Sequence, residues 1–299
     1  MSNTDEHAER FTHLRPLLFT IAYEILGSAT ESDDVLQDSY LRWANVDLAS
    51  VRDTKSYLAQ LVTRQALNAL RAGARRREDY VGPWLPEPLL LEERDGAADV
   101  VLAESVSMGM LVLLETLTPD ERAVFVLREV FGFDYDDIAT AVGKTVVAVR
   151  QMAHRAREHV QARRTRFGPV DSERTAELTA QFMTAATTGD LDGLLSMLAP
   201  NAAWTTDSGG KVSAVSLRTE GAQAVAALLA RFFRMLGRAP GVRIDPVTYN
   251  HAPALAISYR DRLEATIVLE FADGKIANLY CTRNPDKLTA IMVPRSVTR

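Results

Sequence analysis

The spacing of apolar residues changes near residue 168, and this change constrains the fold more than any other feature. Before it, apolar side chains recur every three or four residues, the spacing of one face of an α-helix. After it come further helical segments and then alternating apolar and polar residues from about residue 242 to 281, as in β-strands. The 299 residues suffice for two or three cored domains. We therefore expect a multidomain chain in which two all-α domains precede an α+β domain.

The first predicted helical domain spans residues 6–77 and contains three helices. Its first helix stops at Gly27. The second runs from about Ser32 to Ala44, and its polar residues face outward: Asp34, Gln37, Asp38 and Arg42. The third starts near Thr54. Its polar face and C-terminal end carry Gln60, Asn68 and five arginines: Arg64, Arg71, Arg75, Arg76 and Arg77.

Residues 78–98 form an acidic, proline-rich linker. Three prolines and a glycine between Tyr80 and Leu89 exclude a regular helix and favour an extended path. Seven acidic residues and one arginine lie between Glu78 and Asp99. The linker is therefore predicted to be a connection of its own rather than part of either neighbouring domain.

The second predicted helical domain, residues 99–166, ends in a helix-turn-helix pattern. We expect a helix from about Asp99 to Leu114, and a second one through about Val130 that starts at the capping box Thr118–Glu121. A short helix follows Asp134, Gly143 breaks it, and Thr145 can cap the next one. The outer face of that last helix carries side chains suited to base edges and phosphates: Arg150, Gln151, His154, Arg155 and Arg157.

The last predicted domain, residues 170–299, is of the α+β class. Helices are expected at Ser172–Thr187, Asp190–Leu198 and Ala222–Leu236, with a strand near Trp204. The alternating runs that follow predict an antiparallel sheet, and residues 272–275 predict a hairpin turn within it.

Charge is distributed unevenly along the chain. A net charge of −5 argues against a general nucleic-acid binder. However, five arginines and no acid lie between Arg64 and Arg77, and seven bases against one acid lie between Lys144 and Arg166. Charge runs are usually solvated helix faces, but each of these patches ends a helical domain. Two separate nucleic-acid contacts are therefore the stronger interpretation.

Several classes of protein are excluded by what the sequence lacks. Residues 1–10 are acidic without an apolar run, which excludes a signal peptide, and no later apolar stretch is long enough for a membrane span. We therefore expect a cytoplasmic location and no membrane partner. Cys281 is the only cysteine, so cysteine-pair redox or zinc sensing is excluded. Neither a cofactor nor a metal is expected.

Three segments carry a family resemblance when they occur in this order. Residues 34–43 (DVLQDSYLRW), 57–71 (YLAQLVTRQALNALR) and 149–157 (VRQMAHRAR) resemble regions 2 and 4 of extracytoplasmic-function sigma factors of RNA polymerase. The resemblance covers about Phe11 to Val160. The run GPWLPEP at 82–88 is typical of the sigma group with a cone-shaped SnoaL-like (NTF2-like) C-terminal domain, which residues 170–299 would form.

The resemblance implies roles for particular residues. Core RNA polymerase, through its β′ clamp and β flap, and promoter DNA are the implied partners. Polymerase binding would fall to Asp34, Gln37, Asp38 and Arg42. The −10 element would be melted and bound by Arg64, Asn68, Arg71, Arg75 and Arg76. The −35 element would be read by Thr145, Arg150, Gln151, His154, Arg155 and Arg157, with phosphates bound by Arg163, Arg164 and Arg166.

Two motifs near the end of the chain are assigned to regulation. Residues 207–211 (DSGGK) and 284–288 (NPDKL) resemble elements of the same sigma group, and they predict contacts through which the C-terminal domain controls the sigma regions in cis. The residues concerned are Asp207, Gly209, Gly210, Lys211, Asn284, Pro285, Asp286 and Lys287. Alternatively, these segments are ordinary turns, because the glycines permit positive φ and Asn284 with Pro285 ends a strand.

Two alternative functions stay open at this point. Some SnoaL-like domains are enzymes, and the acid-base candidates here would be Asp207, Tyr249, His251 and Tyr259, although no pair stands at a fixed spacing. A small-molecule ligand of this domain is a better candidate than turnover, and we expect no enzymatic activity. The chain could also be a ligand-sensing regulator that binds DNA through its helix-turn-helix, but the first helical domain would then have no task.

Overall fold

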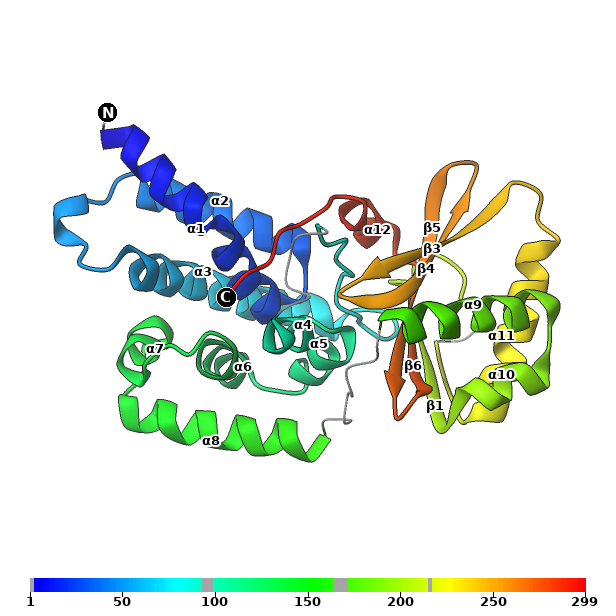
Figure 1. The fold of residues 1–299 in the computed structure, drawn as a ribbon. Helices are drawn as coiled ribbons and strands as arrows, with labels where there is room; N and C mark the ends of the chain where they lie inside the picture. The colour runs from blue at the N-terminus through cyan, green and yellow to red at the C-terminus, as the bar shows by residue number, and fades with distance from the viewer. Residues whose placement is uncertain (1–2, 93–98, 164–171, 215–216) are drawn as a thin grey trace.

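The computed structural model describes residues 3–92, 99–163, 172–214 and 217–299. The helices before residue 164 gather in one half of the molecule, and the sheet lies in the other half with helices of its own (Figure 1). The C-terminal segment runs back from the sheet half and ends against the helical half. The expected fold class, two all-α units followed by an α+β domain, is confirmed.

Three helices and one short 3₁₀ turn form the first helical unit. Helix α1 (Asn3–Leu26) is followed by α2 (Ala29–Trp43), the turn η1 (Leu48–Ser50) and α3 (Thr54–Glu78). Gly27, with φ of 70°, lets the chain reverse after α1, and the Ser28 hydroxyl accepts from Glu31 N to cap α2. The fully buried Trp43 donates from Nε1 to the carbonyl of His7, which ties α2 to α1.

The second helical unit contains six short elements: α4 (Val100–Ser105), α5 (Met108–Leu114), α6 (Pro119–Phe125), the π-helical turn η2 (Val126–Val130), α7 (Tyr135–Val142) and α8 (Val146–Arg163). The single helix predicted over 99–114 is wrong, because Ser107 accepts from Met110 N and starts a new helix. The predicted capping box at Thr118 is confirmed. Gly143 adopts φ of 68° and makes the turn between α7 and α8.

The two helical units share one hydrophobic core. Side chains of α1, α2 and α3 pack in the same buried cluster as those of α4 to α8, and α3 lies against both α6 and α7. Arg122 of α6 is buried in this core, where it donates from Nε to the carbonyl of Glu24 at 2.8 Å and from Nη1 to Glu115 at 2.6 Å. The units are therefore packed as one body rather than held apart by the linker.

A six-stranded sheet organises the C-terminal domain. Helices α9 (Ser172–Thr188) and α10 (Leu191–Met197) lead into β1 (Leu198–Asp207) and β2 (Arg218–Glu220). Helix α11 (Ala222–Gly237) and strands β3 (Val242–Tyr249), β4 (Ala252–Tyr259), β5 (Arg262–Ala272) and β6 (Lys275–Thr282) follow. The strand order is β2-β1-β6-β5-β4-β3, antiparallel except for the parallel pair β1–β6. The hairpin predicted at 272–275 is confirmed.

One face of this sheet packs against the domain's helices. The buried core contains five Phe and Trp rings: Phe182, Trp204, Phe232, Phe233 and Phe271. Helix α11, which was expected at Ala222–Leu236, provides its apolar face to this core. The SnoaL-like expectation agrees with this arrangement of helices against a sheet.

Two segments without strands or long helices join the halves of the molecule. Residues 80–92 of the linker run extended, and residues 85–89 are buried between the two halves. The final helix α12 (Pro285–Ile291) follows β6, and the strap, residues 292–299, returns to the helical half (Figure 1). The strap pairs with the linker through a bridge between Leu91 and Arg295, and Val297 is buried in the helical core.

Candidate polymerase and promoter interfaces and the contacts that cover them

The proposed polymerase-binding residues lie together on one face of α2. Asp34, Gln37, Asp38 and Arg42 are all exposed, and they stand three or four positions apart. Leu41 lies beside them with 58% of its surface exposed, which sequence reasoning missed. A large exposed apolar residue flanked by charges is typical of a protein-docking surface.

The proposed −10 residues follow one row along α3. Arg64, Asn68 and Arg71 are exposed at spacings of four and three. Arg71 forms an ion pair with Asp120 of α6, and Gln60 donates to Asp137 of α7 at 3.1 Å. Arg75 and Arg76 belong to α3, but their side chains lie outside the described residues. The second helical unit therefore contacts the same helix that would bind the −10 element.

The proposed −35 residues lie on α8. Arg150, Gln151, His154 and Arg155 are exposed. Thr145 is exposed as well, and its hydroxyl caps the helix by accepting from Ala148 N at 3.2 Å.

Two arginines of α8 are held in ion pairs within the second helical unit. Arg155 pairs with Glu121 at 3.2 Å. The half-buried Arg157 makes a bidentate ion pair with Glu129, in which Nε donates to Oε2 at 3.1 Å and Nη2 donates to Oε1. Arg163 is exposed at the end of the helix, whereas Arg164 and Arg166 lie outside the described residues.

Asp120 links the two helical units electrostatically. Its carboxylate binds Arg71 of α3 and, at 2.9 Å, Lys144 of the turn before α8. Partial burial alone would raise the pKa of Asp120, but hydrogen bonds from Lys144 and Arg71 outweigh it and hold the pKa below its ordinary value. The single carboxylate of Asp120 thus pairs with one base from each proposed DNA-binding patch, Arg71 and Lys144.

The two C-terminal motifs meet around the linker, in an arrangement we call the clasp. Asp207 of β1 is fully buried, and its carboxylate accepts from the Tyr80 hydroxyl, from Leu85 N at 2.9 Å and from Lys287 Nζ at 2.7 Å. Lys287 also donates to the carbonyl of Leu85, and its ammonium lies 3.4 Å from the centre of the Trp84 ring. Linker residues 80–85 are thereby held by both motifs.

Other motif residues complete the clasp. Asn284 caps α12 by accepting from Asp286 N and donates to the Tyr80 hydroxyl at 2.7 Å. Gly209 and Gly210 have φ of 58° and 67°, and a Cβ on Gly210 would stand 2.8 Å from Val81 Cβ. Glycine is required there for the close approach of the linker. Lys211 and Asp286 form an exposed ion pair across the clasp, and Pro285 begins α12.

Burial strongly affects the tyrosine of the clasp. Desolvation and the adjacent Asp207 raise the pKa of Tyr80 well above its ordinary value, so its hydroxyl stays protonated and donates. The clasp therefore pairs one buried cation with one buried anion, and the remaining acceptor positions of Asp207 are filled by neutral donors.

Three further contact residues were missed from the sequence. Asn250, in the β3–β4 turn at φ of 51°, donates to Val106 O at 2.7 Å and to Tyr23 at 3.0 Å, and accepts from Leu89 N. It therefore joins both helical units, the linker and the sheet. Asparagine is common in turns because it tolerates positive φ, so the sequence around Asn250 gave no indication of these contacts.

The other two are buried glutamates. Glu87 of the linker accepts from the Ser28 hydroxyl and from Ala29 N, both at 2.8 Å, at the N-terminus of α2. Glu270 of β5 accepts from Asn278 and Tyr280 and lies against Gly109 of α5. Burial raises the pKa of both carboxyls. Glu87 stands between Pro86 and Pro88, and this unusual position of an acid was the one sequence feature that could have indicated its buried role.

The strap also contacts the helix proposed to bind polymerase. Arg295 pairs with Asp33 of α2 at 2.7 Å, next to the exposed Asp34, and its guanidinium lies 5.5 Å from the centre of the Phe19 ring. Thr298 N donates to Thr20 of α1 at 3.1 Å. The C-terminus is thus fixed beside the α2 face.

The four candidate acid-base residues are not brought together. Asp207 lies in the clasp, Tyr249 is buried at the end of β3, His251 lies in the following turn, and Tyr259 is exposed at the end of β4 with Arg260 over its ring. Among the described residues, no group of three or more potential metal ligands occurs. In the same part of the chain, no helix is both long and apolar enough to cross a membrane.

Comparison with known proteins decides the family. The sigma-70 region 2 family matches residues 10–76, and the sigma-70 region 4 family matches residues 108–160. The ECF RNA polymerase sigma factor SigJ of Mycobacterium tuberculosis is 32% identical over 290 residues, with 93% of this chain and 92% of SigJ covered. This chain belongs to the ECF sigma factors. The expectation drawn from the three sequence segments is therefore confirmed.

Other relatives agree over the whole length of this ECF sigma factor. The probable ECF sigma factor SigI of Mycobacterium tuberculosis is 28% identical, with 96% of this chain and 97% of SigI covered. The crystal structure of SigJ superposes with a TM-score of 0.76 over 95% of this chain and 99% of that chain, at 28% identity. The sigma-factor role, which is not an enzymatic one, follows from the family, while the residues assigned to each contact stay predictions.

Proposed function

We propose that this ECF sigma factor binds core RNA polymerase through α2 and promoter DNA through α3 and α8, and that its C-terminal domain holds it closed until a signal releases it. Exposure supports the first part, because the α2 face and the α8 face are open to solvent. Acting with polymerase on DNA, the protein would work in the cytoplasm.

The clasp is the observation that carries the proposed regulation in cis. Asp207 and Lys287 are both buried, and between them they bind the linker at Tyr80, Trp84 and Leu85. A linker held in this way cannot move away from the C-terminal domain. Breaking such a pair leaves an uncompensated buried charge, so the clasp opens as a unit rather than one bond at a time.

Promoter geometry explains why the linker has to be released. Elements named −35 and −10 are about 25 base pairs apart, or about 85 Å of duplex. In this structure α3 contacts α6 and α7, which in turn contact α8, and Arg71 and Lys144 share Asp120. Helices packed so closely cannot reach two elements so far apart. The closed form must therefore separate its two helical units before it occupies a promoter.

The test is promoter-specific transcription with core polymerase and purified variants. Lys287→Met removes the clasp cation, and Lys275→Met is the matched control, because Lys275 is exposed on β6. Truncation before Asn284 removes α12 and the strap, and truncation after Gly168 removes the whole domain. We expect Lys287→Met and the Asn284 truncation to raise transcription several-fold, and Lys275→Met to leave it unchanged. If both truncations and Lys287→Met matched the full chain, regulation in cis would be wrong.

A further inference from the structure

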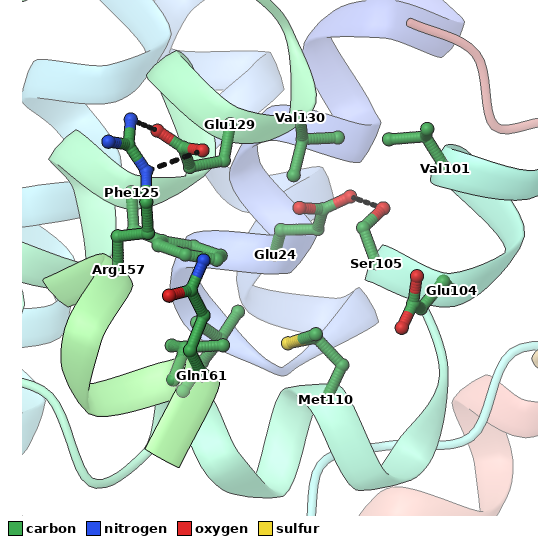
Figure 2. Close-up of a pocket in the computed structure, with 12 residues that line it drawn as sticks. Glu24, Val101, Glu104, Ser105, Met110, Phe125, Glu129, Val130, Arg157 and Gln161 are labelled. Carbon is green, nitrogen blue, oxygen red and sulfur yellow. Dashed lines mark hydrogen bonds and ion pairs between the residues drawn. The ribbon is translucent and has the colours of Figure 1, made fainter. Parts of the chain in front are cut away.

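A cavity lies between the two helical units, and Arg157 is the one residue lining it that is also assigned to promoter contact. Its volume is about 240 Å³; Glu24 of α1 lines one side, and residues of α4, α5, α6, η2 and α8 line the others. Figure 2 shows the Glu24 carboxylate in the middle of the surrounding side chains. Because opposite walls come from different units, the cavity exists only while the units are packed together.

Glu24 is the distinctive group of this cavity. It is fully buried, and its Oε1 accepts from the Ser105 hydroxyl at 2.7 Å. Its Oε2 is buried without a hydrogen-bond partner among the described residues. A buried carboxylate oxygen without a donor is costly, and proteins rarely keep one unless a ligand or a proton satisfies it.

The surrounding charge favours a cationic ligand. Arg122 carries one positive charge near Glu24 but is already paired with Glu115, and Arg157 at the cavity wall is paired with Glu129. Glu104 lines the cavity as well. These six groups comprise four acids and two bases, so with Glu24 ionised the site has an excess of negative charge that a ligand cation would balance.

Apart from Gln161 of α8, the remaining walls are apolar. Met110 and Leu114 of α5, Phe125 of α6 and Val130 of η2 line the cavity. The π-helical turn η2 forms part of this wall, and such turns are often found at functional sites. A cavity of about 150 Å³ accommodates benzene, so 240 Å³ accommodates roughly ten heavy atoms.

We propose that this cavity binds a small organic ammonium ion, with its apolar body against α5 and η2 and its NH₃⁺ group donating to Glu24 Oε2. The ligand would contact walls from both helical units and therefore bind the closed form alone. By mass action it would stabilise that form, a consequence that rests on the proposed function above. Binding itself does not depend on it.

Proton balance gives the site a characteristic pH dependence. Burial raises the pKa of Glu24 to about 8, so near neutral pH its carboxyl carries a proton. An ammonium ion needs the carboxylate, and its binding therefore releases this proton to solvent. Affinity should increase as pH rises from 6 towards 8. The charged groups around Glu24 are Arg122, Glu115, Glu104, Glu129 and Arg157.

The experiment is calorimetric titration of the full chain with 2-phenylethylamine, and with 2-phenylethanol as the neutral match. We expect saturable binding of the amine at one site, and at least tenfold weaker binding of the alcohol. Glu24→Gln should weaken amine binding at least tenfold, since a hydrogen bond to a charged group is lost. The matched control Asp273→Asn changes an exposed acid in the β5–β6 turn and should bind like the unaltered chain.

A second variant covers the case in which Glu24→Gln does not fold. Val101 lies at the rim and is 42% exposed, so Val101→Trp can fill the cavity while Glu24 stays in place. This variant should lose amine binding. The proposal is overturned if the amine shows no saturable binding, if the alcohol binds equally well, or if Val101→Trp binds the amine like the unaltered chain. Because the free chain is titrated, none of these results depends on the transcription assay.

Discussion

At the residue scale, the clasp depends on one buried ion pair. Asp207 and Lys287 lie 80 positions apart in the sequence and meet at 2.7 Å, each almost without exposed surface. Such a pair contributes little net stability relative to apolar side chains, but removing one partner is expensive. We therefore infer that the ion pair serves specificity, because it selects the linker as the segment held between the two motifs.

A double-mutant cycle tests this pair. Lys287→Met alone should lower the free energy of unfolding by about 3 to 5 kcal/mol, because Asp207 stays buried as an anion. Adding Asp207→Asn should recover part of that loss, since the uncompensated charge is removed. Urea denaturation of the two single variants and the double variant measures the coupling. Strictly additive losses would show that the two groups do not act as a pair.

At the element scale, α8 and α2 each present a face whose use can be tested separately. The residues of these faces were predictable from helical spacing, because exposed polar positions recur every three or four residues. Their partners across the molecule were not. Arg71 and Arg155 meet Asp120 and Glu121 through tertiary packing, which periodicity does not encode.

Variants of α8 should separate base reading from phosphate binding. Replacing Arg150 or Gln151 by alanine should cost about 1 to 3 kcal/mol at one promoter position and relax preference there. Arg163→Ala should weaken binding to all sequences alike. Arg157→Ala should instead lower stability, because Arg157 is paired with Glu129. Binding of holoenzyme to a promoter library measures these differences, and a uniform loss for all four variants would contradict the docking.

Charge reversal on α2 should affect polymerase rather than DNA. Asp34→Lys and Asp38→Lys change exposed carboxylates beside the exposed Leu41, and we expect each to weaken binding to core polymerase about tenfold. Asp192→Lys on α10 is the matched control, as an exposed acid far along the chain. Core affinity is measured by titration with labelled sigma factor. Unchanged core affinity together with reduced promoter binding by preformed holoenzyme would refute the assignment.

At the scale of the whole molecule, the sequence predicted the parts better than their assembly. Fold class, the capping box at Thr118 and the β5–β6 hairpin followed from local patterns. The three-way contact of Asn250 and the return of Val297 to the helical core did not. These contacts join residues more than 100 positions apart, and a single sequence carries no information on which distant surfaces meet.

The molecule is closed, and contacts between distant segments hold its helical units, linker and C-terminal domain together. The linker is held by the clasp, the strap reaches α1 and α2, and Asp120 binds bases from both proposed DNA-binding patches. Opening requires that these contacts be exchanged for contacts with polymerase and DNA. Because such exchange is an equilibrium, weakening one contact should shift the population without any ligand.

The most direct test is the distance between the helical units, measured by pulsed electron resonance on spin labels at Ala49→Cys and Ala162→Cys. Both positions are exposed, while native Cys281 is fully buried and burial raises the pKa of its thiol to about 12, so labelling is selective. We predict one narrow distance distribution in the free chain, a mixture of that distance and a longer one in Lys287→Met, and the longer distance in the promoter-bound holoenzyme. The longer distance in the free chain, or an unchanged distance in the holoenzyme, would contradict a closed free form.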